Sequence, residues 1–399
     1  MSWEYKTLDE LGTISRGKSK HRPRNDASLF GGKYPFVQTA DVKAANLYLT
    51  EYESTYNDKG LSQSKLWEVG TLCITIAANI ADTAILGIDA CFPDSIMGFQ
   101  PYEGISNVKF IKYSFDMLQK DCKQISQGAA QDNLSWNKLS TIKFPAPDIA
   151  IQNKIADMLS VYDDLIENNQ KQIKLLEEAA QRLYKEWFVD MRFPGYKDCK
   201  IVDGVPEGWE RKKISDLGEI VTGKTPSTSK EQYYGGDIPF VKIPDMHGCV
   251  YPIATESTLT KEGADTQKNK FIPKNGIMVS CIATVGLVNI AVEPCQTNQQ
   301  INSIILSNED DVYYVYSTMR RLKTMLDGVG SNGATMTNVN KTKFGNIKIF
   351  YPDEQLRKAY YVFCKPIFEK IFALSMSNNK LAGVRDRLLP KLMNGEIEV

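Results

Sequence analysis

Apolar residues recur at helical spacing in two long stretches of the chain. Between positions 151 and 187 there is neither proline nor glycine, and apolar side chains return every three or four residues, which predicts one long amphipathic helix. Residues 356–392 repeat the pattern, although Pro366 and Pro390 predict kinks or breaks in this second helix. About 37 residues at about 1.5 Å per residue would give a helix roughly 55 Å long.

A helix with a single apolar stripe needs a surface that covers it. The other long helix is one candidate, and a two-fold relation between the repeats would make the pair an antiparallel coiled coil. The alternative is that each helix packs on the segment next to it in the sequence. We expect the stripe to comprise Ile151, Ile155, Met158, Tyr162, Leu165, Leu176 and Leu183 in the first helix, and Leu356, Phe363, Ile367, Ile371, Leu374, Leu381 and Leu388 in the second.

The remaining sequence alternates short apolar runs with turn residues. Runs at 72–76, 85–88 and 108–111 predict buried strands in the first half, and runs at 278–282, 287–292 and 301–306 predict them in the second. A helix is expected over 312–326. These patterns predict mixed α+β globular segments.

The two halves are copies of one another. The segment GGKYPFV at 31–37 matches GGDIPFV at 235–241, and LG with GKS at 11–19 matches LG with GKT at 217–225. The offset stays between 204 and 206 and the order is kept, which indicates an internal repeat. The fold class is therefore α+β, with two repeated domains and two long helices. The expected boundaries are 1–147 for the first repeated domain, 148–192 for the first helical spacer, 193–208 for a linker, 209–352 for the second repeated domain and 353–399 for the C-terminal helical spacer.

Composition excludes several classes of protein. Lysine plus arginine equals aspartate plus glutamate, 48 against 48, so this is no generally basic nucleic-acid binder, and any phosphate contact must be local. No apolar run approaches the roughly 20 residues that span a bilayer, and the start of the sequence is not that of a secretion signal. The eight cysteines lack C-x-x-C spacing, and His21 and His247 stand alone, which argues against a metal site. We expect a cytoplasmic protein with reduced cysteines and no membrane contact.

Residues 12–19 and 218–225 both fit the P-loop pattern, so a nucleotide-binding enzyme is one alternative function. A P-loop, however, needs a buried strand before it and a helix after it. Residues 5–10 do not read as a buried apolar strand, and Pro23 and Pro226 follow the two motifs closely, which argues against a helix. A duplicated coiled-coil scaffold without a DNA role is a second alternative.

Two loops carry side chains suited to nucleic acid. The first places five basic residues within nine positions, which favours phosphate contact. The second is richer in hydroxyls, and nearby segments are rich in amides, which pair with adenine in the major groove. The expected DNA-binding residues are Arg16, Lys18, Lys20, Arg22 and Arg24 in the first half, and Lys224, Thr225, Ser227, Lys230, Asn298, Gln299, Gln300, Asn332, Asn338, Asn340 and Lys341 in the second.

Several motifs resemble those of the specificity subunits of type I restriction-modification systems. GDIPFV at 236–241 resembles the family's early strand motif, and VPEGW at 205–209 resembles the start of its second recognition domain. Residues 151–166 resemble its central helix, and LLPKLMNGEI at 388–397 resembles its C-terminal signature, the most specific of the four. The first copy departs from the family pattern at 39–41 and at 127–136.

The resemblance implies a recognition subunit that catalyses nothing itself. Each repeat would be a target-recognition domain that reads one half of a split, asymmetric site in double-stranded DNA, and the helices would fix the gap. The helices would also dock two adenine-N6 methyltransferase subunits, which flip their target base. Two restriction and translocase subunits would complete the complex. No cofactor is expected on this chain, whereas S-adenosylmethionine, ATP and Mg²⁺ are expected on the partners.

Overall fold

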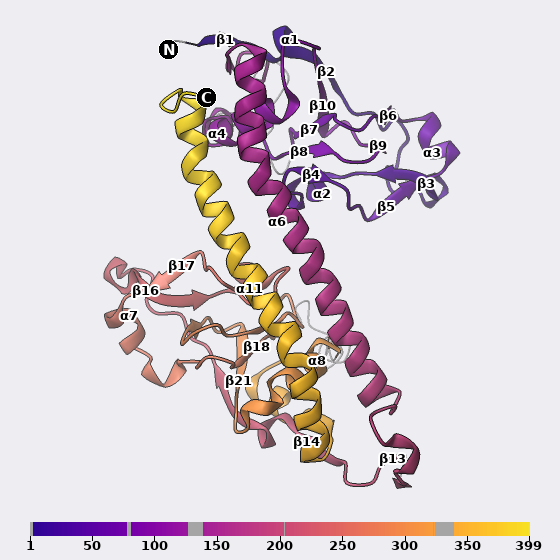
Figure 1. The fold of residues 1–399 in the computed structure, drawn as a ribbon, viewed down its shortest axis with the longest axis vertical. Coiled ribbons are helices and arrows are strands. Elements are labelled where there is room, and N and C mark those ends of the chain that lie inside the picture. The colour runs from indigo at the N-terminus through magenta and orange to yellow at the C-terminus, as the bar shows by residue number, and fades with distance from the viewer. Residues whose placement is uncertain (1–2, 78–80, 127–138, 203, 322, 324–338) are drawn as a thin grey trace. The chain divides into compact units, whose positions relative to one another are not determined.

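The computed structural model describes residues 3–77, 81–126, 139–202, 204–321, 323 and 339–399 (Figure 1). The chain forms two compact units. Unit 1 comprises Met1–Asn168 together with Lys380–Val399, and unit 2 comprises Asn169–Asn379. Each unit therefore combines one globular segment with part of each long helix.

Unit 1 contains two main sheets and a helix. Figure 1 shows β3, β5 and α3 on the side of the unit away from α6. Helix α4 (Val108–Ser126) packs on β8 of the larger sheet. The larger sheet has the order β2 (Gly12–Arg16), β10 (Ile96–Pro101), β7 (Leu72–Thr75), β8 (Thr83–Leu86) and β4 (Tyr48–Leu49). The smaller sheet has the order β5 (Ser54–Tyr56), β3 (Phe30–Phe36), β9 (Ala90–Cys91) and β6 (Leu66–Trp67). Outside them, β1 (Glu4–Lys6) pairs with β11 (Phe144–Ala146), and the short helices are α1 (Leu8–Leu11), α2 (Thr39–Ala44) and α3 (Asp58–Ser62).

Unit 2 repeats this arrangement. Its larger sheet has the order β15 (Gly218–Thr222), β21 (Ile301–Leu306), β18 (Ile277–Ser280) and β19 (Val288–Ile290). Its smaller sheet has the order β17 (Ser257–Leu259), β16 (Tyr234–Val241) and β20 (Gln296–Thr297). Strand β14 (Glu210–Lys213) pairs with β22 (Lys348–Tyr351), β12 (Ile201–Val202) pairs with β13 (Val205–Pro206), and the shorter helices are α7 (Lys261–Asp265), α8 (Val312–Arg321) and α10 (Lys341–Gly345).

The duplication extends to irregularities of the sheets. In unit 1 both Phe30 and Tyr34 lie opposite Tyr56, and in unit 2 both Tyr234 and Ile238 lie opposite Leu259, so the same β-bulge occurs twice. The first glycine of each GG pair has a left-handed φ, +82° at Gly31 and +85° at Gly235. Such a φ is strained for residues with a Cβ, which explains why both copies keep this glycine. The predicted repeat and α+β fold class are confirmed.

Most predicted strands are found, but one was wrong. Residues 108–111 begin helix α4 rather than a strand. Asn107 caps this helix, because its Oδ1 accepts hydrogen bonds from the amides of Lys109 (2.9 Å) and Phe110 (3.2 Å). A short apolar run fits a buried strand and a buried helical turn equally well. The helix predicted over 312–326 is α8, which the structure describes as far as Arg321.

Both long helices are present. Helix α6 spans Ile149–Tyr184 and continues into a π-helical turn, Lys185–Val189, and α11 spans Glu354–Met393. The expectation of a break at Pro366 and Pro390 was wrong, since α11 runs through both residues, and a kink at either position stays a prediction. Pro366 removes one backbone hydrogen bond, whose carbonyl belongs to Val362. Val362 is 68% exposed, so solvent can satisfy that carbonyl.

A buried side chain in the first turn of each long helix forms the same hydrogen bond to the preceding backbone. Gln152 and Arg357, at equivalent positions of the repeat, are both buried. Gln152 Nε2 donates to the carbonyl of Pro147 at 2.8 Å, and Arg357 Nε donates to the carbonyl of Pro352 at 3.0 Å. A buried side chain thus anchors the start of each helix to the end of the preceding strand.

The helices pair with each other within both units. In unit 1, Asp163 of α6 forms an ion pair with Arg385 of α11. In unit 2, Asn169 Nδ2 donates to Asn378 Oδ1 at 2.8 Å, and Tyr360 Oη donates to the carbonyl of Ala180 at 3.4 Å. Residue numbers rise on α6 as they fall on α11, so the expected antiparallel pairing is confirmed. The helices also pack on their own globular segments, so the two arrangements considered above occur together.

The buried stripe differs from the expected one at three positions. Met158, Leu165 and Phe363 are 44%, 45% and 57% exposed, and Leu159 and Ile166 are buried instead of the first two. The stripe shifts because each helix must face both its partner and a globular segment. The rest of the expected set is buried or half-buried: Ile151, Ile155, Tyr162, Leu176, Leu183, Leu356, Ile367, Ile371, Leu374, Leu381 and Leu388.

Candidate nucleic-acid interface

Each unit carries a Gly-Lys turn, defined here as residues 17–18 in unit 1 and 223–224 in unit 2, held against a facing turn, residues 92–95 and 297–300. The amide of Gly17 donates to the carbonyl of Ile96 (2.8 Å), and that of Lys18 to Phe92 (3.0 Å). In unit 2 the equivalent bonds join Gly223 to Ile301 (3.1 Å) and Lys224 to Thr297 (2.9 Å). The two units therefore share one backbone frame at this place.

Close packing explains the glycine in each Gly-Lys turn. A Cβ on Gly17 would lie 2.3 Å from the carbonyl oxygen of Pro93, and one on Gly223 would lie 2.2 Å from that of Asn298. The five residues before each glycine are strands β2 and β15, and no helix directly follows Lys18 or Lys224. The backbone amides are thus not gathered at a helix N-terminus, and this geometry does not suit the nucleotide-binding alternative.

The five basic residues expected in unit 1 are exposed, and one carboxylate neutralises part of the strip. Arg24 Nη2 lies 2.6 Å from Asp94 Oδ1, and Arg22 Nη2 lies 3.8 Å from Asp94 Oδ2. Arg22 also donates to the carbonyls of Ser19 (2.7 Å) and His21 (2.8 Å), so its side chain folds back on the loop. Within the described part of the chain Arg16, Lys18 and Lys20 form no ion pair, and they supply the free positive charge of the strip.

His21 has a structural role in this loop. Its Nε2 lies 2.7 Å from Asp26 Oδ2, and Asp26 Oδ1 accepts from the Ser28 amide at 2.9 Å. These bonds, the Ser28 bond above all, lower the pKa of Asp26 to about 2. In the described ranges no group of three or more His, Cys, Asp and Glu side chains could hold a metal ion.

In unit 2 the corresponding surface carries hydroxyls and amides. Thr225 Oγ1 donates to Gln299 Oε1 at 2.6 Å. Ser227 is exposed, and its Oγ lies 2.9 Å from that of Ser229. Lys230 donates to the Tyr233 hydroxyl at 2.9 Å, a bond that raises the pKa of Lys230. Lys224 and Gln299 are exposed.

Several of the expected amides are occupied by local structure. Asn298 and Gln300 close the facing turn: Asn298 Nδ2 donates to Gln300 Oε1 (3.0 Å), and the Gln300 amide donates to Asn298 Oδ1 (3.1 Å). Asn340 caps α10, where its Oδ1 accepts from the Lys343 amide at 2.9 Å. Lys341 is exposed in the first turn of that helix, and Asn332 and Asn338 lie outside the described residues. Among the expected DNA-binding amides that the structure describes, Gln299 is therefore the one whose exposed side chain is best placed to face a ligand.

Sequence reasoning missed Asp94. A carboxylate does not suggest contact with DNA, and it lies 70 residues from its partner Arg24. The repeat held the signal, because Asp94 occupies the position of Gln299 when the halves are aligned with an offset of 205.

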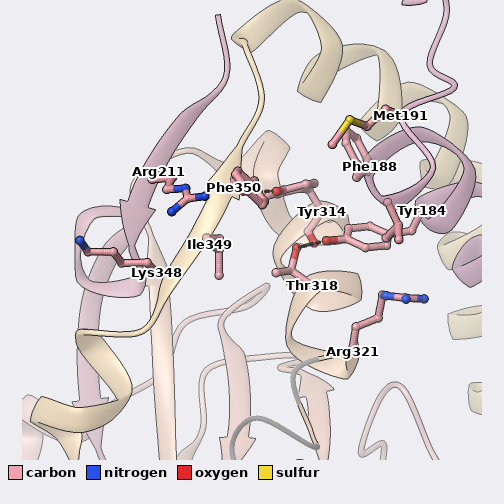
Figure 2. Close-up of a pocket in the computed structure, with 11 residues that line it drawn as sticks. Tyr184, Phe188, Met191, Arg211, Tyr314, Thr318, Arg321, Lys348, Ile349 and Phe350 are labelled. Atoms are coloured by element: carbon pink, nitrogen blue, oxygen red, sulfur yellow. Dashed lines mark hydrogen bonds between the residues drawn. The ribbon is translucent and has the colours of Figure 1, made fainter. Parts of the chain in front are cut away.

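Unit 2 also contains a pocket of about 470 Å³ (Figure 2). Its walls are mainly aromatic and aliphatic, and inside it the Tyr184 hydroxyl lies 2.9 Å from Thr318 Oγ1. Burial raises the pKa of Tyr184. Three cationic side chains, Arg211, Arg321 and Lys348, line the pocket, and none of the described lining residues is acidic. None of its residues comes from the loops discussed above, and the lining was not expected from the sequence because four separate segments supply it.

Apolar side chains are exposed on both long helices. Met158 on α6 and Phe363 on α11 occupy equivalent positions of the repeat, and both face solvent. Val161 (55% exposed) lies one turn from Met158, and Val362 lies beside Phe363. Within the described residues no helix is both long and apolar enough to cross a bilayer. The repeat thus exposes an apolar side chain at the same position of both helices.

Comparison with known proteins gives a consistent picture. The family model described as type I restriction modification DNA specificity domain matches residues 1–178 and 206–363. The HindI specificity subunit of Haemophilus influenzae is 35% identical over 336 residues, 68% of this chain and 72% of the relative. The MjaIX specificity subunit of Methanocaldococcus jannaschii is 25% identical over 416 residues, 100% of this chain and 94% of the relative. The crystal structure of a type I S subunit from M. genitalium shares the fold, with a TM-score of 0.60 and 15% identity over 98% of this chain and 96% of that one.

Proposed function

This chain belongs to the type I restriction-modification specificity subunits, and from that premise we propose that it reads a DNA target in two separate parts, one with each repeat. The observation that carries the proposal is the shared backbone frame of the two Gly-Lys turns, which bear different surface side chains in units 1 and 2. One scaffold used twice with different side chains supports two related but unequal half-sites.

We further propose that the paired helices keep the gap between the half-sites constant. Helix α6 has 36 residues, or about 54 Å at 1.5 Å per residue, which is longer than one turn of B-DNA at about 34 Å. Its pairing with α11 is fixed by contacts in both units, and such a spacer resists bending more than a single helix does.

The exposed helix positions support docking of two methyltransferase subunits. The apolar residues Met158 and Phe363 are equivalent in the repeat, so each could meet the same surface of one partner copy. S-adenosylmethionine, ATP and Mg²⁺ would then bind to the methyltransferase and the two restriction subunits. This chain would contribute DNA recognition to a complex that methylates adenine at N6 and cleaves DNA.

Selection of bound duplexes from a random pool tests the reading of a split target. The full chain, mixed with its methyltransferase partner, should enrich two unlike short motifs separated by a constant number of unread base pairs. One continuous motif, a palindrome or a variable gap would contradict the proposal.

Substitution of the basic strip tests the scaffold alternative. Replacing Arg16, Lys18 and Lys20 together by alanine should weaken binding to all duplexes and flatten the dependence of affinity on salt. An unchanged salt dependence would favour a scaffold without a DNA role.

Docking is tested by Met158→Asp combined with Phe363→Asp. Both positions are exposed, so the fold should persist, while association with the methyltransferase should weaken at least tenfold in analytical ultracentrifugation. Lys154→Asp, another exposed change on α6, is the matched control. Equal association of the two variants would refute docking at these positions.

A further inference from the structure

Positions 94 and 299 are equivalent in the repeat and lie in the facing turn of each unit, but they carry different chemistry. Asp94 accepts a hydrogen bond from Arg24 at 2.6 Å, whereas Gln299 accepts one from Thr225 at 2.6 Å. In each unit this residue thus holds a side chain from the segment that follows the Gly-Lys turn. The same backbone frame presents a carboxylate and a guanidinium in one copy, and an amide and a hydroxyl in the other.

In unit 2 the geometry leaves Gln299 ready to pair with a base. The Thr225 hydroxyl orients the Gln299 carbonyl oxygen, which has a second lone pair available. The Gln299 side-chain nitrogen donates no hydrogen bond to any described residue, so it is available to a ligand. A neutral amide gains little from a phosphate, but its donor and acceptor match N7 and the N6 amino group of adenine.

In unit 1 Asp94 lies nearer to Arg24 than to Arg22, so its carboxylate mainly offsets the charge of Arg24, most of whose donors remain available. Arg24 uses one terminal nitrogen on Asp94, and half of its side chain is exposed, 49%. The Asp94 carboxylate repels phosphate, so a paired guanidinium is poorly suited to the DNA backbone. Its fixed fork of donors still matches O6 and N7 of guanine.

We infer that positions 94 and 299 set the base preference of the two half-sites: Gln299 reads an adenine, and Arg24, positioned by Asp94, reads a guanine. This inference rests on the proposed DNA-reading function. Exposed lysines such as Lys18 and Lys224 beside these residues are left to contact phosphates.

The test is selection of duplexes by the full chain and its variants from a random pool, followed by sequencing. Gln299→Ala should lower the preference for adenine at one position of one half-site by about 5- to 100-fold and leave the other half-site unchanged. Arg24→Lys keeps the charge but not the fork, so it should lower the guanine preference at one position of the other half-site. Asp94→Ala should do the same if Asp94 positions Arg24, and Asp94→Glu should restore part of the preference.

The outcomes separate the two levels of the argument. If the unaltered chain enriches no split motif, the proposed function fails before any variant is considered. If it enriches one and these variants weaken binding equally for every sequence, with a shallower salt dependence, the residues contact phosphates and the inference is overturned. Circular dichroism of each variant checks that an exposed substitution has left the fold intact.

Discussion

The two units join α6 to α11 through different side chains. We call the contact between the two helices the seam. In unit 1 the seam contains the buried carboxylate of Asp163, whose side chain is 3% exposed. This carboxylate accepts a hydrogen bond from the Tyr113 hydroxyl at 2.5 Å and pairs with Arg385. In unit 2 the position equivalent to Asp163 is Phe368, whose ring stacks on Tyr313 with centroids 4.3 Å apart. A repeated backbone therefore does not imply a repeated core.

This difference bears on which helices can pair. Arg385 corresponds to Ala180 in the other helix, so two copies of α6 paired with each other would bury Asp163 without a cation. Leu389, Leu392 and Met393 of unit 1 correspond to the larger Tyr184, Trp187 and Phe188, which would overfill the same space. The seam thus favours pairing of α6 with α11 over pairing of like helices.

The largest loss of stability is expected when the aspartate of the unit 1 seam is placed at the equivalent position of unit 2. Phe368→Asp removes a buried ring that packs on Tyr313 and Tyr316 and leaves a buried carboxylate whose equivalent of Arg385 is Ala180, which should destabilise unit 2 by about 5 kcal/mol or more in urea unfolding of the full chain. Adding Ala180→Arg should recover part of this loss. Lys370→Asp, an exposed neighbour, is the control, and an equal effect of the two aspartates would refute the comparison.

A somewhat smaller loss is expected from removal of the carboxylate in unit 1. Asp163→Ala leaves the buried Tyr113 hydroxyl without its acceptor, while Arg385 keeps its second partner Asp386, so the cost should be about 1–3 kcal/mol in the same unfolding measurement. Asp164→Ala, one residue along and exposed, should change stability by less than about 0.5 kcal/mol. Similar values for both variants would mean that the ionic seam contributes little.

A still smaller effect is expected at the asparagine pair of unit 2. Asn169→Leu alone leaves the Asn378 amide without its partner and should cost about 1 kcal/mol. The double change to leucine should return stability to the original value or exceed it, because a polar pair in a seam fixes register at the expense of stability. Additive losses in a double-mutant cycle would show that the two amides do not interact.

The smallest effect is one of reactivity rather than stability. Burial raises the pKa of the Cys364 thiol, on α11 in the core of unit 2, to about 12, so very little of the reactive thiolate forms at pH 8. Cys364 should resist iodoacetamide until urea opens this core, while the half-buried Cys199 reacts. Mass spectrometry of alkylated peptides would reveal early labelling of Cys364, which would mean that this core opens in the folded chain.

The sequence was most informative where one physical pattern dominates. The long helices follow from unbroken apolar periodicity, and the duplicated fold follows from glycines such as Gly31 and Gly235, which a left-handed turn requires. The beginning of α4 was misjudged because an apolar run has no period of its own, although alignment with the second repeat would have placed residue 108 in a helix. The exact stripe on each helix was not predictable, since Met158 and Leu159 are equally apolar and only the globular segments decide which is buried.

The candidate interface was less accessible to sequence reasoning. Composition located the two loops, but an amide cannot be assigned to a turn, a helix cap or a ligand until its neighbours are known. Asn298 and Asn340 proved to serve local structure, and Asp94 came into view only through its contact with Arg24.

The division of the chain into units has a consequence for its synthesis. Unit 2 is a single continuous segment, whereas unit 1 needs both the first 168 residues and the last stretch, Lys380–Val399. Leu389, Leu392 and Met393 from that last stretch belong to the core of unit 1. On the ribosome unit 2 can therefore fold before unit 1 is complete, and the nascent N-terminal half must wait with part of its apolar core uncovered until residues 380–399 have been made.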